Sequence, residues 1–152
     1  YEGDYLNGER TGEGIFKCVN GDKYVGQFKE GYMCGMGTYT WKNGDIYTGQ
    51  WKNDLQNGHG KLTKKSGDVF DGTFKDGKPD GQIIIHYANG CKYKGTFKQG
   101  KRNGPAIEED REGKRFEGSY LDDKRDGKFV EKDRNGKIVK TGHYEGGRRF
   151  DD

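Results

Sequence analysis

The stretch YVGQFKEGYMCGMGTYTWKNGD, residues 24–45, decides the fold of this chain, because it is one copy of a unit that recurs along the sequence. Its first five residues alternate in character, which places Tyr24 and Phe28 on one face of a strand with Gly26 between them. The missing side chain at Gly26 leaves room for an aromatic ring to pack over the backbone. Residues 35–41 alternate again and predict a second strand. The unit therefore predicts a β-hairpin.

The period of this unit is 23 residues. Its first aromatic recurs as Tyr1, Tyr24, Tyr47, Phe70, Tyr93 and Phe116. Two residues after each of these aromatics comes a glycine, as Gly3, Gly26, Gly49, Gly72, Gly95 and Gly118. Self-similarity at a fixed period is the signature of a repeat architecture. We expect six repeats in residues 1–138, namely 1–23, 24–46, 47–69, 70–92, 93–115 and 116–138, and a partial, divergent seventh in residues 139–152. Because the sequence opens inside the pattern, we expect a piece of a longer protein.

Glycine-containing segments are expected to connect the strands. The segment from Lys29 to Cys34 predicts a loop. Asn43-Gly44, which recurs as Asn-Gly at residues 20, 89 and 135, predicts a tight hairpin turn, because both residues tolerate positive φ. No helix is expected, since each glycine inside a helix costs about 1 kcal/mol.

The composition fits such an array better than a globular core. Only 28% of the 152 residues are hydrophobic and 35% are charged, yet 13% are aromatic and glycine occurs 28 times. Hairpins that stack in order bury a narrow ladder of aromatic rings and glycines, and they need few aliphatic side chains. We therefore predict an all-β fold: an elongated single-layer solenoid of consecutive antiparallel β-hairpins with a right-handed twist, one hairpin per repeat.

The pattern Tyr-x-Gly-x-(Phe/Trp), then Gly-x-Gly, then Asn-Gly-Asp resembles the MORN repeat (membrane occupation and recognition nexus). Residues 24–45 and 47–68 resemble nearly ideal copies, and the resemblance covers essentially the whole chain. MORN arrays serve as cytoskeletal or ciliary scaffolds, as membrane-apposed adaptors, and as accessory segments of SET-domain lysine methyltransferases and phosphoinositide kinases. The resemblance therefore implies the fold strongly and leaves these functions open.

The later repeats depart from the pattern. The second glycine of Gly-x-Gly becomes Ile83, Ala106 and Phe129 in repeats four to six. The aromatics equivalent to Tyr39 and Trp41 become acidic in repeats five and six, as Glu108, Asp110, Glu131 and Asp133. This change predicts either a polar cap at the end of the array or a junction that docks another domain or a second copy of the chain.

The sequence contains no motif typical of a catalytic, cofactor or metal site. Residues 95–102 approach a phosphate-binding loop but lack the final Ser or Thr, and the repeat itself explains their glycines. Three cysteines and three histidines are scattered singly, so no metal site or disulfide framework is expected. With a net charge of only +3, no nucleic-acid surface is expected either. We predict a chain without enzymatic activity or cofactors.

Two surfaces are candidates for binding. The first is an aromatic groove that would take a peptide or helix of a protein partner, with Tyr39, Trp41, Tyr47, Trp51 and Tyr87 as candidate residues. The second is a basic cluster in repeat five that would contact an acidic partner or an anionic membrane, with Lys92, Lys94, Lys98, Lys101 and Arg102 as candidates.

We therefore expect a non-catalytic scaffold for protein–protein interaction in the cytoplasm, associated with the cytoskeleton, a cilium or a membrane. The alternatives are a regulatory segment of an enzyme, namely a SET-domain methyltransferase or a phosphoinositide kinase, and a phospholipid-binding adaptor. Unpaired strand edges at the ends of the array predict some self-association, with a homodimer as one form of it.

Overall fold

The computed structural model describes all residues from 1 to 152 and consists of strands and turns without any helix. It therefore holds no helix that could cross a membrane. The chain divides into two compact units, residues 1–78 and 79–152, which we describe separately. The all-β architecture of repeated hairpins predicted from the sequence is confirmed.

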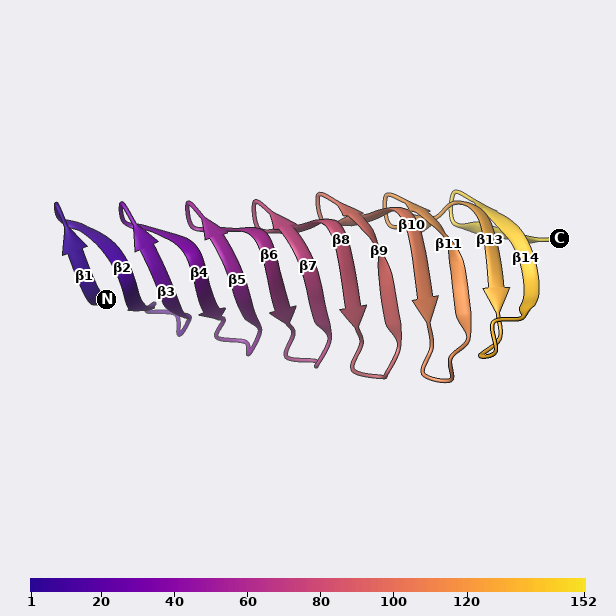
Figure 1. The fold of residues 1–152 in the computed structure, drawn as a ribbon, viewed down its shortest axis with the longest axis horizontal. Coiled ribbons are helices and arrows are strands. Elements are labelled where there is room, and N and C mark those ends of the chain that lie inside the picture. Colours follow the sequence, from indigo (N-terminus) through magenta and orange to yellow (C-terminus); the bar gives the residue numbers. More distant parts are fainter. The chain divides into compact units, whose positions relative to one another are not determined.

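Unit 1 is a row of antiparallel strands in which each strand pairs with the next along the chain (Figure 1). Its strands are β1 (Glu2–Leu6), β2 (Glu9–Lys17), β3 (Lys23–Lys29), β4 (Tyr32–Thr40), β5 (Ile46–Lys52), β6 (Leu55–Thr63) and β7 (Val69–Lys75). Strands β3 and β5 show the simplest pattern, with every second residue buried. The alternation predicted from residues 24–28 therefore separates an inner face, which carries the aromatic core, from an exposed outer face.

Unit 2 is built in the same way. Its strands are β8 (Lys78–His86), β9 (Lys92–Lys98), β10 (Lys101–Glu109), β11 (Arg115–Leu121), β12 (Lys124–Arg125), β13 (Gly127–Lys132), β14 (Ile138–Glu145) and β15 (Arg148–Asp151). From β8 to β11 each strand pairs with the next, and then β11 pairs with both β12 and β13. The divergent end of the chain thus continues the hairpin pattern through β14 and β15.

We expected tight two-residue turns at the Asn-Gly pairs, but the structure has them at the other connection of each repeat. Asn43 does not adopt positive φ. Only Gly44 does, at 100°, and it closes a three-residue loop in which its N–H donates to the Trp41 carbonyl at 3.0 Å. Such a loop combines an ordinary turn with one left-handed residue, so Asn-Gly here does not form a two-residue turn.

The predicted loop from Lys29 to Cys34 is instead a two-residue turn. Glu30 and Gly31 have φ of 53° and 85°, and strand β4 already begins at Tyr32. Both central residues with positive φ define the primed turn that matches the twist of a hairpin. Of the remaining residues of the expected loop, Lys29 ends β3, whereas residues 32–34 belong to β4 and lead into a bulge.

The ring that we expected to pack over Gly26 packs instead over Gly37, the second glycine of the Gly-x-Gly pair, while Gly26 makes room for the backbone of the neighbouring strand. Gly26 pairs with Gly37 across β3 and β4, and the ring of Tyr24 covers Gly37. The Tyr24 hydroxyl donates to the Gln27 carbonyl at 2.9 Å, which satisfies this polar group inside the core. In unit 2 the equivalent positions carry the buried side chains Ile83, Ala106 and Phe129.

Candidate functional site

The inner face of unit 1 rests on a ladder of buried aromatic rings. Tyr24 lies edge-on to Phe28 and Trp51 at centroid distances of 5.1 and 5.5 Å. Tyr47 lies edge-on to Trp51 and Phe74, at 5.2 Å from each. Edge-to-face pairs at these distances are the favoured geometry of aromatic packing. All five side chains are at most 5% exposed, so they form a buried core against which further side chains of the inner face pack.

Above this core lies a second layer of partly exposed side chains, which we call the aromatic strip and define as Phe16, Tyr39, Trp41 and Leu62. All four pack against the buried ladder. The rings of Tyr39 and Trp41 are 4.8 Å apart, and Tyr39 lies 5.8 Å from the buried Trp51. The strip therefore offers apolar surface to a ligand while its rings are already held in place.

Asp22 fixes the orientation of Tyr39. Its carboxylate accepts hydrogen bonds from the Lys42 backbone N–H and from the Tyr39 hydroxyl, both at 2.8 Å. These two bonds, with the backbone bond first, hold the pKa of Asp22 below its ordinary value. Because Lys42 belongs to the next loop along the sheet, Asp22 also ties two successive repeats together.

The structure divides the predicted aromatic site. Tyr39 and Trp41 lie together in the aromatic strip, whereas Tyr47 and Trp51 are buried beneath it. Tyr87 belongs to unit 2, where its hydroxyl accepts a hydrogen bond from Arg102 at 3.0 Å. In unit 1, only Tyr39 and Trp41 of the candidate residues are therefore open to a ligand.

The inner face of unit 2 carries ion pairs where unit 1 carries rings. Glu108 and Glu131 stand at the repeat position of Tyr39. Glu108 pairs with Arg125 at 2.9 Å, and Glu131 pairs with Arg149 at 2.7 Å. Arg125 also donates to the hydroxyls of Tyr120 and Tyr144 at 3.3 and 3.1 Å.

The environment of Arg125 keeps it charged. Burial alone would lower its pKa, but the hydrogen bonds to Tyr120 and Tyr144 and the nearby charge of Glu108 raise the pKa overall. Its guanidinium stacks 3.9 Å from the centroid of the Phe116 ring. Arg125 is thus fully engaged within the chain, and it holds the inner face of unit 2 together.

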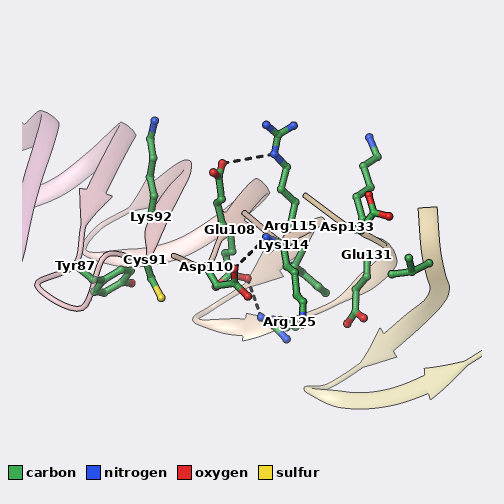
Figure 2. Close-up of a pocket in the computed structure, with 14 residues that line it drawn as sticks. Tyr87, Cys91, Lys92, Glu108, Asp110, Lys114, Arg115, Arg125, Glu131 and Asp133 are labelled. Atoms are coloured by element: carbon green, nitrogen blue, oxygen red, sulfur yellow. Dashed lines mark hydrogen bonds and ion pairs between the residues drawn. The ribbon is translucent and has the colours of Figure 1, made fainter. Parts of the chain in front are cut away.

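A cavity of about 540 Å³ opens beside this ion pair, and Figure 2 shows its lining. Its lining includes Phe116, Arg125 and the acidic residues of the two polar repeats. The carboxylate of Asp110 accepts two backbone hydrogen bonds from its own loop, at 2.9 and 3.0 Å, and Asp133 does the same. Since these acids are occupied in holding loops and arginines, they serve structure in this cavity. No group of three or more metal-ligating side chains is placed to hold a metal.

The predicted basic cluster is split between the two faces of unit 2. Lys92, Lys94 and Lys98 are exposed on β9 and alternate with the buried residues of that strand. Lys101 pairs with Lys98 across the turn, so it shares their outer face. Arg102 pairs with Phe97 and lies on the inner face, with its guanidinium 5.1 Å from the centroid of the Tyr93 ring.

Sequence reasoning missed the roles of Arg125 and Arg149. The signal was available, because Arg102 and Arg125 are one 23-residue period apart and Arg149 follows after the one-residue insertion. Each arginine lies at the repeat position where a hairpin re-enters the sheet after its tight turn.

The fold and these surfaces define a class, a scaffold of repeated β-hairpins that presents side chains on a β-sheet. The MORN repeat model matches residues 1–23, 24–46, 47–69, 70–92, 93–115 and 116–137. The chain therefore belongs to the MORN-repeat family.

No curated protein sequence matches the chain. Among solved structures, the chain is similar to the TCP domain of SAS-4 (dCPAP) from Drosophila melanogaster, solved in complex with a proline-rich motif of Ana2 (dSTIL). The TM-score is 0.52 at 15% identity, and the match covers 92% of this chain and 83% of that chain. At this identity the likeness shows a shared fold.

Proposed function

We propose that this chain is a non-catalytic scaffold that binds an extended segment of a protein partner on the aromatic strip. The observation that carries the proposal is the pair Tyr39 and Trp41, whose rings are partly exposed yet packed 4.8 Å apart on a buried ladder. Rings that are already ordered lose little conformational entropy when a ligand covers them.

The indole N–H of Trp41 favours a peptide as the ligand. The other indole in the chain, that of Trp51, donates to the Gly37 carbonyl at 3.1 Å, whereas the indole of Trp41 has no acceptor within the chain. A partly exposed ring with a free donor suits a backbone carbonyl of a bound segment. The strip thus combines apolar contact with one directional hydrogen bond.

The spacing of the repeats favours a proline-rich segment. Two strands about 4.8 Å apart make one repeat, so equivalent side chains recur every ~9.6 Å across the sheet. A polyproline II helix has three residues per turn at about 3.1 Å each, which gives a turn of ~9.3 Å. A segment of this kind laid across the strands would present one turn to each repeat. Aromatic-lined grooves commonly bind such segments.

The similar solved structure adds support by analogy. In it, a domain of this fold is in complex with a proline-rich motif. A place at cytoskeletal or ciliary structures in the cytoplasm stays a prediction from the family resemblance, and imaging a fluorescent fusion of the protein would test it.

Calorimetric titration of the chain with an oligoproline peptide tests the proposed function. We expect saturable binding that Trp41→Ala weakens at least tenfold. The matched control is Tyr32→Ala, because Tyr32 is an aromatic of the same unit that is 49% exposed outside the strip. Equal affinity of the wild type and the Trp41 variant, or no binding to the wild type, would overturn the proposal.

A further inference from the structure

Three arginines occupy one repeat position in unit 2, namely Arg102, Arg125 and Arg149. Each guanidinium lies over an aromatic ring of the inner face. The distances to the nearest ring centroids are 5.1 Å for Arg102 over Tyr93, 3.9 Å for Arg125 over Phe116, and 4.6 Å for Arg149 over Phe129. The same cation–π contact between an arginine and a ring of the inner face therefore occurs in three successive hairpins.

Two of these arginines have a carboxylate partner and one has none. Arg125 and Arg149 pair with Glu108 and Glu131, each the inner-face residue of the preceding hairpin. The residue at that position before Arg102 is Ile85, which is fully buried and apolar. Arg102 accordingly forms no ion pair within the chain.

The other groups around Arg102 do not neutralise it. Its guanidinium donates one hydrogen bond, to the Tyr87 hydroxyl at 3.0 Å, and lies over the rings of Tyr93 and Tyr120. Its Nε atom and the hydroxyl of Tyr93 are buried without a hydrogen-bond partner. Glu108 reaches Tyr120 at 2.9 Å, but Arg125 already binds it.

The equivalent arginine of unit 1, Arg10, also lacks a carboxylate partner, but none of its nitrogens is buried without a hydrogen-bond partner. Arg10 lies 4.7 Å from the centroid of the Phe16 ring and donates to the Gly31 carbonyl at 3.0 Å. A half-buried guanidinium with unused donors is costly to desolvate, and a bidentate oxyanion is the partner that best matches its planar fork.

We propose that Arg102 is a binding site for an oxyanion, the carboxylate or phosphate of an acidic segment of a partner protein. The incoming oxyanion supplies Arg102 with the negative charge that Glu108 supplies to Arg125 and Glu131 supplies to Arg149, and it approaches from solvent because Ile85 fills the equivalent inner-face position. The rings of Tyr87 and Tyr120 flank it. This site lies in unit 2 and is independent of the aromatic strip, so it extends the scaffold to a second class of ligand.

Side-chain ¹H–¹⁵N spectra of the labelled chain test this site, because the Nε–Hε group of each arginine gives its own resonance. The probes are a hexaglutamate peptide and a peptide of equal length that alternates phosphoserine with glycine, and a hexaglutamine peptide is the neutral control. We expect the Arg102 resonance to shift and saturate with at least one acidic probe. The resonances of Arg125 and Arg149 should stay in place. The better of the two acidic probes identifies the source of the oxyanion.

Four variants separate binding from folding. Arg102→Met keeps the apolar stem over the rings and should weaken the acidic probe about tenfold or more, while Arg102→Lys should weaken it less. Arg149→Met removes an arginine that is already paired and should leave the affinity unchanged. Trp41→Ala should also leave it unchanged, which separates this site from the proposed function. The proposal is overturned if neither acidic probe shifts Arg102, or if all three arginines shift together without saturation.

Discussion

The phenol ring of Tyr24 covers the backbone of Gly37 on the neighbouring strand so closely that no β-carbon fits between them. This contact explains why the first three repeats have a glycine at that position, as Gly14, Gly37 and Gly60, although the backbone of Gly37 does not require positive φ. It also lets the Trp51 indole reach the Gly37 carbonyl. The lack of a side chain at Gly37 thus allows the ring of Tyr24 to pack directly on the backbone of the sheet.

Gly37→Ala should therefore destabilise the chain by about 1–3 kcal/mol, the usual cost of overpacking a well-filled core. Urea denaturation followed by circular dichroism measures the change. Gly8→Ala is the control, because a β-carbon there meets nothing within 4 Å and the cost comes only from its φ of 81°. A loss at Gly37 no larger than at Gly8 would contradict the packing role of Tyr24.

Asp54 replaces the usual glycine in a primed turn and has φ of 70°. Its carboxylate accepts a hydrogen bond from the Met33 N–H at 2.7 Å, while its own N–H donates to the Met33 carbonyl at 3.1 Å. Asp54→Ala keeps the left-handed strain and loses the side-chain bond, so it should cost about 1 kcal/mol or more. Asp54→Gly loses the bond and relieves the strain, so it should cost less. The same denaturation assay ranks the two variants, and the reverse order would refute this role.

Acid should lower the stability of the early repeats by weakening the hydrogen bonds that Asp22 and Asp45 accept from the next repeat. The pKa values of Asp22 and Asp45 lie below the ordinary value of 3.8, chiefly because each carboxylate accepts a backbone hydrogen bond from the next loop. The stabilisation is present above the unfolded pKa and is lost as the pH falls through the lowered one. Combined Asp22→Asn and Asp45→Asn should flatten the fall of the thermal midpoint between pH 4 and pH 2, while Asp4→Asn should not. A variant curve parallel to the wild-type curve would argue against this role of the hydrogen bonds.

High pH should lower the stability of the fold by ionising a tyrosine of the buried ladder. Burial raises the pKa of Tyr47 to about 12. A raised pKa stabilises the fold below the ordinary value of 10.0, and this contribution disappears as the pH rises toward 12. Tyr47→Phe should cost about 1 kcal/mol at neutral pH through the lost hydrogen bond to the Gln50 carbonyl and make stability less dependent on pH above 10. Equal dependence in both proteins would show that Tyr47 does not titrate with unfolding.

The fold could be predicted from the sequence because its decisive positions are glycines and aromatics in a fixed period. Close packing requires an aromatic at the position of Tyr24 and a glycine at the position of Gly26, and both requirements recur in each repeat. The turns were harder to predict, since Asn-Gly fits two kinds of loop. Its three-residue loop needs left-handed φ only at Gly44, whereas the primed turn at Asn53-Asp54 contains no glycine at all.

The candidate surfaces were predictable only in part, because exposure depends on what covers a ring. Trp41 and Trp51 have the same chemistry, yet only Trp51 is enclosed by Tyr24 and Tyr47. Arg102 is next to Lys101 in the sequence, but neighbouring residues of a strand point to opposite faces. The lack of a carboxylate beside Arg102 becomes visible only when its surroundings are compared with those of Arg125.

The most direct test of the scaffold function follows the fluorescence of Trp41 alone. Trp51→Phe makes Trp41 the single tryptophan, and phenylalanine occupies the same position in other repeats, as Phe28, Phe74 and Phe97. We predict that an oligoproline peptide shifts the emission of Trp41 to shorter wavelength and that the shift saturates at the affinity measured by calorimetry. An emission of Trp41 that stays unchanged while the peptide binds, or a peptide that does not bind at all, would contradict the account.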